Sequence, residues 1–141
     1  MTMYLLDTNV CIALINGRDP GLRRRFQRAV ASGGIVLLSS IVAFELWYGV
    51  EKSQRKENNA QRLHVFLSGP MEWTPFDDQD ARAAGAIRGE LEKIGKPIGA
   101  YDLLIAGQAR HRGATLVSAN SSEFSRVADL AWEDWATPRK R

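Results

Sequence analysis

The chain has 141 residues, of which 45% are hydrophobic and 25% are charged, so we expect one globular domain over residues 1–141 with its own core. Cys11 is the only cysteine and lies in an apolar run, which excludes a disulfide framework and predicts a buried thiol. The apolar stretch at residues 5–15 is too short to span a bilayer and no basic leader precedes it, so we expect a cytoplasmic protein without a membrane anchor.

Apolar runs alternate with amphipathic segments along the whole chain. In chain order we expect a strand over Met3–Leu6, helices over 10–16 and 22–30, a strand over Ile35–Leu38, helices over 41–52 and 63–67, a strand over Met71–Phe76, helices over 78–94 and 101–109, a strand over Ala114–Ser118 and a shorter strand over Ala131–Trp135. Alternation of this kind implies right-handed crossovers, and therefore an α/β fold with a mainly parallel sheet of four to five strands.

Three carboxylates stand in otherwise apolar surroundings. Asp7 ends the first strand, Glu45 is the only charge within residues 35–50, and Asp102 is the only charge within residues 99–109. Burying one unpaired carboxylate costs several kcal/mol, and no Lys or Arg shares these faces. We therefore expect the three acids to meet and hold a divalent metal. Oxygen-only ligation suits Mg²⁺ or Mn²⁺ and disfavours zinc. For Asp7 alone, capping of the following helix is an equal alternative.

Two further segments supply polar side chains near these acids. Thr8 and Asn9 follow Asp7 directly, and Ser118 and Asn120 follow a buried strand, so all four could orient metal ligands or water. Glu123 could add a further charge. The alternative for the segment after residue 117 is an ordinary turn, which its Ser and Asn content also favours.

Basic side chains crowd the second helix, and a positively charged face favours a polyanionic partner. The candidates for contacting phosphates, or an acidic partner, are Arg23, Arg24, Arg25 and Arg28. A solvated surface is the alternative reading, and it is the one we favour for the tail Arg139-Lys140-Arg141. His64 and His111 are expected to be structural or exposed.

Four segments together resemble the signature of PIN-domain ribonucleases, and within that family the VapC toxins of bacterial toxin–antitoxin pairs. They are Leu6–Asn9, Ser39–Glu45, Gly95–Ala106 and Leu116–Val127. The resemblance covers essentially the whole chain, and Pro-Ile-Gly-x-x-Asp-x-Leu-Ile-Ala at residues 97–106 is its most specific part. It implies a small three-layer α/β/α domain that cleaves RNA with a metal bound to acidic side chains.

Carried over by position, the resemblance makes Asp7, Glu45 and Asp102 the core metal-binding acids. The last segment departs from the common pattern, because many PIN domains have aspartate where Asn120 stands and threonine where Ser118 stands. An acid precedes the phenylalanine in many VapC proteins, as Glu123 does here, so Glu123 is expected to supply the missing charge. Whether a second metal binds stays open.

The resemblance also implies partners. VapC toxins form homodimers and are silenced by a cognate antitoxin whose tail enters the acidic site or covers nearby helices. Relatives that cut the anticodon loop of a transfer RNA suggest initiator transfer RNA as the substrate. The apolar residues Phe44, Trp47 and Tyr48 exceed what a small core needs, so they favour such an interface about as much as simple core packing.

Two other functions were weighed. A non-catalytic RNA- or protein-binding PIN module would share the fold, but the intact trio of acids argues against it. A phosphatase with Asp7 as covalent nucleophile needs a second acid two residues later, where this chain has Asn9. The sequence therefore predicts a metal-dependent endoribonuclease.

Overall fold

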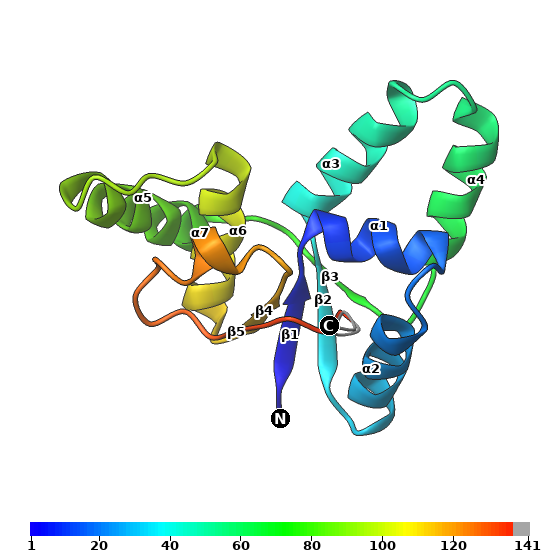
Figure 1. The fold of residues 1–141 in the computed structure, drawn as a ribbon, viewed down its shortest axis with the longest axis horizontal. Helices are drawn as coiled ribbons and strands as arrows, with labels where there is room; N and C mark the ends of the chain where they lie inside the picture. The colour runs from blue at the N-terminus through cyan, green and yellow to red at the C-terminus, as the bar shows by residue number, and fades with distance from the viewer. Residues whose placement is uncertain (137–141) are drawn as a thin grey trace, which may run out of the picture.

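The structure is a computed structural model, and it describes residues 1–136 (Figure 1). Five strands form one sheet in the order β3-β2-β1-β4-β5, and every neighbouring pair is parallel. The mainly parallel sheet predicted from the alternation is therefore confirmed. The strands are β1 (Met3–Leu6), β2 (Ile35–Ser39), β3 (Glu72–Thr74), β4 (Thr115–Val117) and β5 (Trp132–Glu133).

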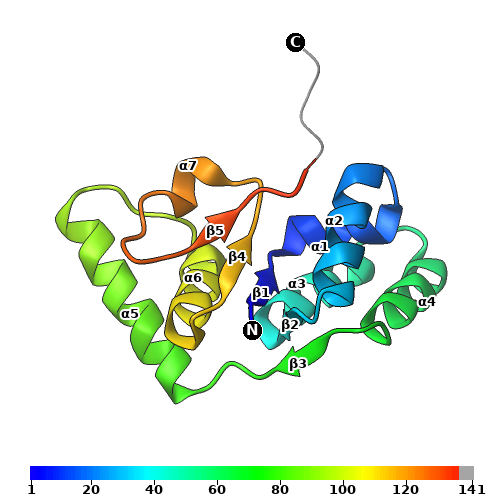
Figure 2. The same cartoon turned by 90° about the horizontal axis from the view of Figure 1, so that it is seen from below.

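Helices cover both sides of this sheet, as a three-layer α/β/α domain requires. Helices α5 and α6 pack against each other on one side, whereas α1, α2 and α4 lie on the other side (Figures 1 and 2). The helices are α1 (Thr8–Asn16), α2 (Pro20–Ala31), α3 (Ser40–Glu51), α4 (Lys56–Leu67), α5 (Asp78–Lys93), α6 (Ala100–Arg112) and α7 (Ser121–Phe124).

The core follows from the apolar runs of the three central strands. Leu5, Val36 and Leu116 are at most 1% exposed, because strands of a parallel sheet with helices on both faces bury both sets of side chains. Cys11, a residue of α1, is fully buried as predicted, and this burial raises the pKa of its thiol. The thiol therefore stays protonated and acts as a small apolar side chain.

Two helices differ from the sequence-based prediction. Helix α4 begins at Lys56, about two turns earlier than expected, and α7 forms where we considered a turn. The first turns of α4 are polar and solvent-exposed, and Leu63 is its one fully buried side chain, so no apolar stripe marks where it begins. Helix α7 is a single turn of four residues, too short to show any periodicity.

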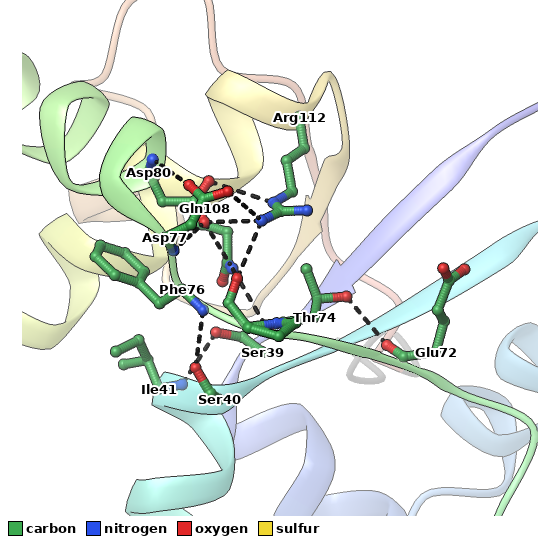
Figure 3. A network of polar contacts seen from close by, with 11 residues as sticks. Ser39, Ser40, Ile41, Glu72, Thr74, Phe76, Asp77, Asp80, Gln108 and Arg112 are labelled. Carbon is green, nitrogen blue, oxygen red and sulfur yellow. Dashed lines mark hydrogen bonds and ion pairs between the residues drawn. The ribbon is translucent and has the colours of Figure 1, made fainter.

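A buried polar network fixes α6 to α5 and to the end of β3 (Figure 3). Asp80 is fully buried and receives two hydrogen bonds from Arg112, at 3.0 and 3.2 Å. Gln108 donates to the same carboxylate and to the carbonyls of Thr74 and Pro75, at 3.2–3.3 Å. Burial alone would raise the pKa of Asp80, but the hydrogen bonds and charge of Arg112 hold it below its usual value. The network therefore keeps an ionised carboxylate in the interior.

Two predictions concern the chain outside these elements. The basic tail Arg139–Arg141 lies outside the described residues. Within residues 1–136, no helix is both long enough and apolar enough to cross a bilayer.

Candidate active site

Asp7 lies at the carboxyl end of β1, the edge at which parallel α/β sheets bind ligands. Its backbone N–H donates to Val117 of β4 at 3.0 Å, so the residue is fixed between the two central strands. One carboxylate oxygen caps α1 by accepting from the Val10 N–H at 2.9 Å, and the other accepts from the Ser118 hydroxyl. The capping role and the site role that we weighed against each other are thus compatible.

The Asp7 carboxylate is buried, and its hydrogen bonds only partly offset the cost of burying its charge. The residue is 6% exposed, and this burial raises its pKa, with a further increase from the nearby charge of Glu45. Hydrogen bonds from Ser118 and from the N–H groups of Val10 and Asn9 act in the opposite direction but do not restore the usual value. A cation at this point would stabilise the ionised form.

Glu45 reaches the same region from α3, which starts at the end of β2. One of its carboxylate oxygens accepts a hydrogen bond from the Thr8 hydroxyl at 2.8 Å, across 37 positions of sequence. Thr8 therefore orients Glu45, while Ser118 orients Asp7. Asn9 is exposed and contributes its backbone N–H to Asp7.

Asp102 and Glu123 form the second pair of acids. Asp102 lies in the first turn of α6, Glu123 lies in α7, and their side chains hydrogen-bond to each other. Burial, this hydrogen bond and the charge of Glu123 raise the pKa of Asp102 to about 7, and the charges of Asp7 and Glu45 add to the effect. The same hydrogen bond lowers the pKa of Glu123. The pair therefore shares one proton, which stays on Asp102 in mildly acidic solution.

Asn120 contacts two side chains of the site. Its side-chain NH₂ donates to Glu123 at 2.7 Å, and its carbonyl oxygen accepts from the Ser122 hydroxyl at 3.2 Å. Its backbone N–H also donates to Ser118 at 2.9 Å. Asn120 thus orients Glu123 and Ser118, and its amide oxygen is directed to Ser122.

The four acids fit a divalent cation by chemistry. All are oxygen donors, and no ion pair found within residues 1–136 involves any of them. The charge of Glu45 raises the pKa of Asp7, and the charges of Glu123, Asp7 and Glu45 raise the pKa of Asp102. In the described part of the chain, however, no three acidic, imidazole or thiol side chains already surround one point closely enough to hold an ion. Thr8 occupies one carboxylate oxygen of Glu45, and Glu123 is hydrogen-bonded to the Asp102 carboxyl group, so bound metal would use the remaining oxygens or replace these contacts.

The arginines of α2 do not join the acids. All four are exposed. Arg25 pairs with Glu133 at 3.5 Å, and its guanidinium lies 5.6 Å from the ring centre of Trp135. The two histidines are exposed, as expected, and the ring of His64 contacts that of Trp47.

Of the three aromatic side chains of α3, only that of Trp47 packs against the core. Phe44 is 52% exposed and Tyr48 is 59% exposed, whereas Trp47 is partly buried against the core. Core packing therefore does not account for Phe44 and Tyr48. The ring of Phe44 contacts that of Tyr101, at 5.6 Å between centres, so an exposed aromatic pair stands directly beside Glu45 and Asp102 in sequence.

Comparison with known proteins identifies the same fold and the same class of enzyme. The family described as "PIN domain" matches residues 4–130. The tRNA(fMet)-specific endonuclease VapC of Shigella flexneri is 40% identical over 96% of this chain and 100% of its own. Ribonuclease VapC2 of Haemophilus influenzae (strain ATCC 51907 / DSM 11121 / KW20 / Rd) is 42% identical over 96% of this chain and 99% of its own.

Solved structures agree with the relatives found by sequence. VapBC2 from Rickettsia felis, bound to a DNA fragment from its promoter, superposes with a TM-score of 0.89 at 40% identity, over 95% of this chain and 99% of that one. DNA-bound VapBC from Salmonella typhimurium gives a TM-score of 0.88 at 39% identity, over 96% and 100%. The chain belongs to the PIN-domain family and, within it, to the VapC ribonucleases.

Proposed function

We propose that this chain is the toxin of a toxin–antitoxin pair and cleaves RNA with Mg²⁺ or Mn²⁺ held by Asp7, Glu45 and Asp102, with Glu123 as the fourth acid. The observation that carries the proposal is a group of mutually repelling carboxylates at one sheet edge with no ion-pair partner within residues 1–136. PIN-domain ribonucleases generally depend on a divalent metal, and oxygen-only donors suit these two ions.

The residues of this chain would divide the work between binding and orientation. When bound, the ion lowers the pKa of a water molecule and offsets charge that develops on the phosphodiester. Ser118 keeps one oxygen of Asp7 in place, Thr8 does so for Glu45, and Asn120 does so for Glu123. Asp102 would release its proton when the ion arrives, since a nearby cation lowers the pKa of a carboxyl group.

The proposed substrate is a structured RNA, and initiator transfer RNA is the specific candidate. Support comes from the Shigella flexneri and Salmonella typhimurium relatives, both named tRNA(fMet)-specific endonucleases. Single-stranded loops are the parts of an RNA whose phosphates and bases a surface-edge site can reach. The proposed cleavage position is the anticodon loop, because it is a single-stranded loop of the transfer RNA.

The proposed partner is an antitoxin chain. A hollow of ≈ 220 Å³ lies between α1, α3 and α4 and reaches Glu45, and most of its exposed lining is apolar. Ile12, Leu46 and Arg62 are among its lining residues. An antitoxin segment seated there could place an arginine at the acids and compete with metal by charge. The exposed rings of Phe44 and Tyr48 are the proposed homodimer contact.

The direct test is cleavage of initiator transfer RNA by the wild-type chain and by Asp102→Asn, with and without Mn²⁺. We expect the wild type to cleave only with metal and Asp102→Asn to lose at least 10²-fold in rate while keeping its circular dichroism spectrum and melting cooperativity. Full activity in the variant would overturn the assignment. Calorimetric titration with Mn²⁺ separates the alternative binding module, which has no reason to bind metal at the acids.

A further inference from the structure

We propose that a groove along α2 holds the phosphate backbone of the RNA beside the cleaved bond. We call it the arginine groove and define it by Arg24, Arg25, Arg28 and the Trp135 that forms its floor. The proposal rests on the proposed function and deepens it, because it says how a structured RNA is held outside the acid cluster.

Three open hollows that meet on one face of α2 make up the groove. They measure ≈ 520, ≈ 350 and ≈ 410 Å³, and Arg28 lines all three. Arg24 and Arg25 each line two of them. Arg23 is on the same helix but lines none of these hollows. The structure thus divides the arginine cluster of α2 into three groove residues and one that faces elsewhere.

One end of the groove is connected through Glu133 to the sheet edge that carries the acids. Arg25 of α2 reaches the Glu133 carboxylate of β5 at 3.5 Å. The backbone carbonyl of Glu133 accepts a hydrogen bond at 2.9 Å from the N–H of Ser118, whose hydroxyl donates to Asp7. A nucleic acid strand that leaves the acids over the end of β5 would therefore arrive at Arg25, and then at the other arginines.

The charges along the groove are available to a ligand. In the described part of the chain, Arg24 and Arg28 make no ion pair, and Asp134 is the only acid among the residues that line the three hollows. The two arginines are four positions apart, about 6 Å along a helix, so they lie on one face and point the same way. Guanidinium groups bind phosphate oxygens through paired hydrogen bonds.

The floor of the groove is rigid. Trp135 is 4% exposed, and its ring packs edge-on against Tyr4 with 5.0 Å between centres. The Arg25 guanidinium lies over the Trp135 ring, 5.6 Å from the ring centre. Arg25 is therefore held between the ring and Glu133, and it sets the shape of the groove, while Arg24 and Arg28 supply the free charge.

An RNA backbone fits these observations better than an acidic protein segment does. Among the described residues, the groove carries two guanidinium groups without an ion pair, Arg24 and Arg28, and Arg25 connects it to Glu133 at the end of β5. The hollow between α1, α3 and α4, which reaches Glu45, is the surface proposed above for an antitoxin segment. RNA phosphates need only the charge and the spacing.

The test is equilibrium binding of an RNA stem-loop in EDTA, where no cleavage occurs, at a series of KCl concentrations. The variant is Arg24→Gln with Arg28→Gln. We expect it to bind about tenfold more weakly at low salt, and the slope of log K against log[KCl] to become less steep by about 1.4, because each lost phosphate contact on a single strand removes about 0.7. The matched control is Arg82→Gln with Arg88→Gln on α5, which removes the same charge from exposed positions on the other side of the sheet.

The outcomes separate this inference from the proposed function. Equal slopes for the wild type, the groove variant and the control would overturn the inference, even if the wild type cleaves RNA with Mn²⁺. A groove variant that keeps RNA binding but loses binding to an acidic peptide would also overturn it. If the wild type fails to cleave while only the groove variant shows the less steep salt dependence, the inference stands and the proposed function fails.

Discussion

Asp7 and Asp102 have hydrogen-bond partners of different kinds, which act in opposite directions on their pKa values. Asp7 is buried and has N–H and hydroxyl donors, whereas Asp102 has another acid as its hydrogen-bond partner. The result is a carboxyl group, Asp102, that stays protonated close to neutral pH beside Glu123, whose pKa is lowered. Such separation of pKa values marks a place where charge is expected to change on ligand binding.

Stability of the metal-free protein should fall as pH rises from about 5 to 7 and then level off. The folded-state pKa of Asp102 is raised from 3.8 to about 7, so the folded protein binds the proton that the unfolded chain has lost, and this advantage disappears as pH passes 7. The pKa of Asp7 is shifted in the same direction. Glu123 has a lowered pKa, so its opposite contribution is lost only as pH falls below about 4.5 and does not affect this window.

Asp102→Asn should flatten this pH dependence. We expect the variant to gain about 1–2 kcal/mol relative to wild type at pH 8, once solvent screening of a half-buried group is allowed for. Thermal melts in EDTA at pH 5–8 measure the effect. The same decline in both proteins would show that Asp102 is not the titrating group.

Ser118→Ala should weaken metal binding without unfolding the protein. The change removes the hydroxyl that donates to Asp7, and loss of a group that orients a metal ligand typically costs 10–100-fold in affinity. Calorimetry with Mn²⁺ measures it. Ser122→Ala is the matched control, because the Ser122 hydroxyl is exposed and donates only to Asn120 in the described contacts. Equal affinities for the two variants would contradict the assigned role of Ser118.

At the scale of elements, the packing of α5 against α6 fixes where Asp102 stands. Gly107 of α6 lies so close to α5 that an added Cβ would be 2.5 Å from the Ala84 nitrogen. The network of Asp80, Gln108 and Arg112 fastens the same two helices nearer the end of α6 (Figure 3). The N-terminus of α6, with its acid, is therefore carried by a helix pair that cannot separate or rotate freely.

Gly107→Ala should destabilise the fold by about 1–3 kcal/mol, because the extra methyl group forces the two backbones apart. Chemical denaturation measures the change. Gly85→Ala, on α5, is the control: its added Cβ meets nothing within 4 Å, so replacing a helical glycine should stabilise the protein by about 0.5–1 kcal/mol. Equal effects of the two substitutions would mean that the helices are not in close contact.

The site residues that the sequence predicts are charged residues within apolar runs. Asp7, Glu45 and Asp102 were isolated charges in apolar runs, and the structure brings all three close enough for their charges to act on one another. Asp80 gave no such signal, because it stands among the polar residues that begin α5 and its inward orientation depends on Arg112, 32 positions later. The sequence did not predict the start of α4 for a related reason, because exposed polar turns show no hydrophobic periodicity.

At the scale of the whole molecule, the topology gathers the site. Strand order β3-β2-β1-β4-β5 places the ends of β1, β2 and β4 side by side, so segments more than 100 positions apart meet at one edge. The parallel sheet was predictable from alternation, and so was the edge on which ligands bind. The pairing of Asp102 with Glu123, and the division of the α2 arginines, were not predictable because both depend on where loops and helix faces point.

The proposed site requires that Asp7, Glu45 and Asp102 converge on a divalent cation that offsets their charge. The most direct measurement is the melting temperature of the wild type and of Asp102→Asn during titration with Mn²⁺ at pH 7.5. A ligand that binds only the folded state stabilises by about 2.7 kcal/mol at one hundred times its Kd. We expect the Tm of the wild type to rise with Mn²⁺ concentration until it saturates, and Asp102→Asn to abolish most of this rise. A wild-type Tm that does not move at millimolar Mn²⁺, or an equal rise in both proteins, would contradict it.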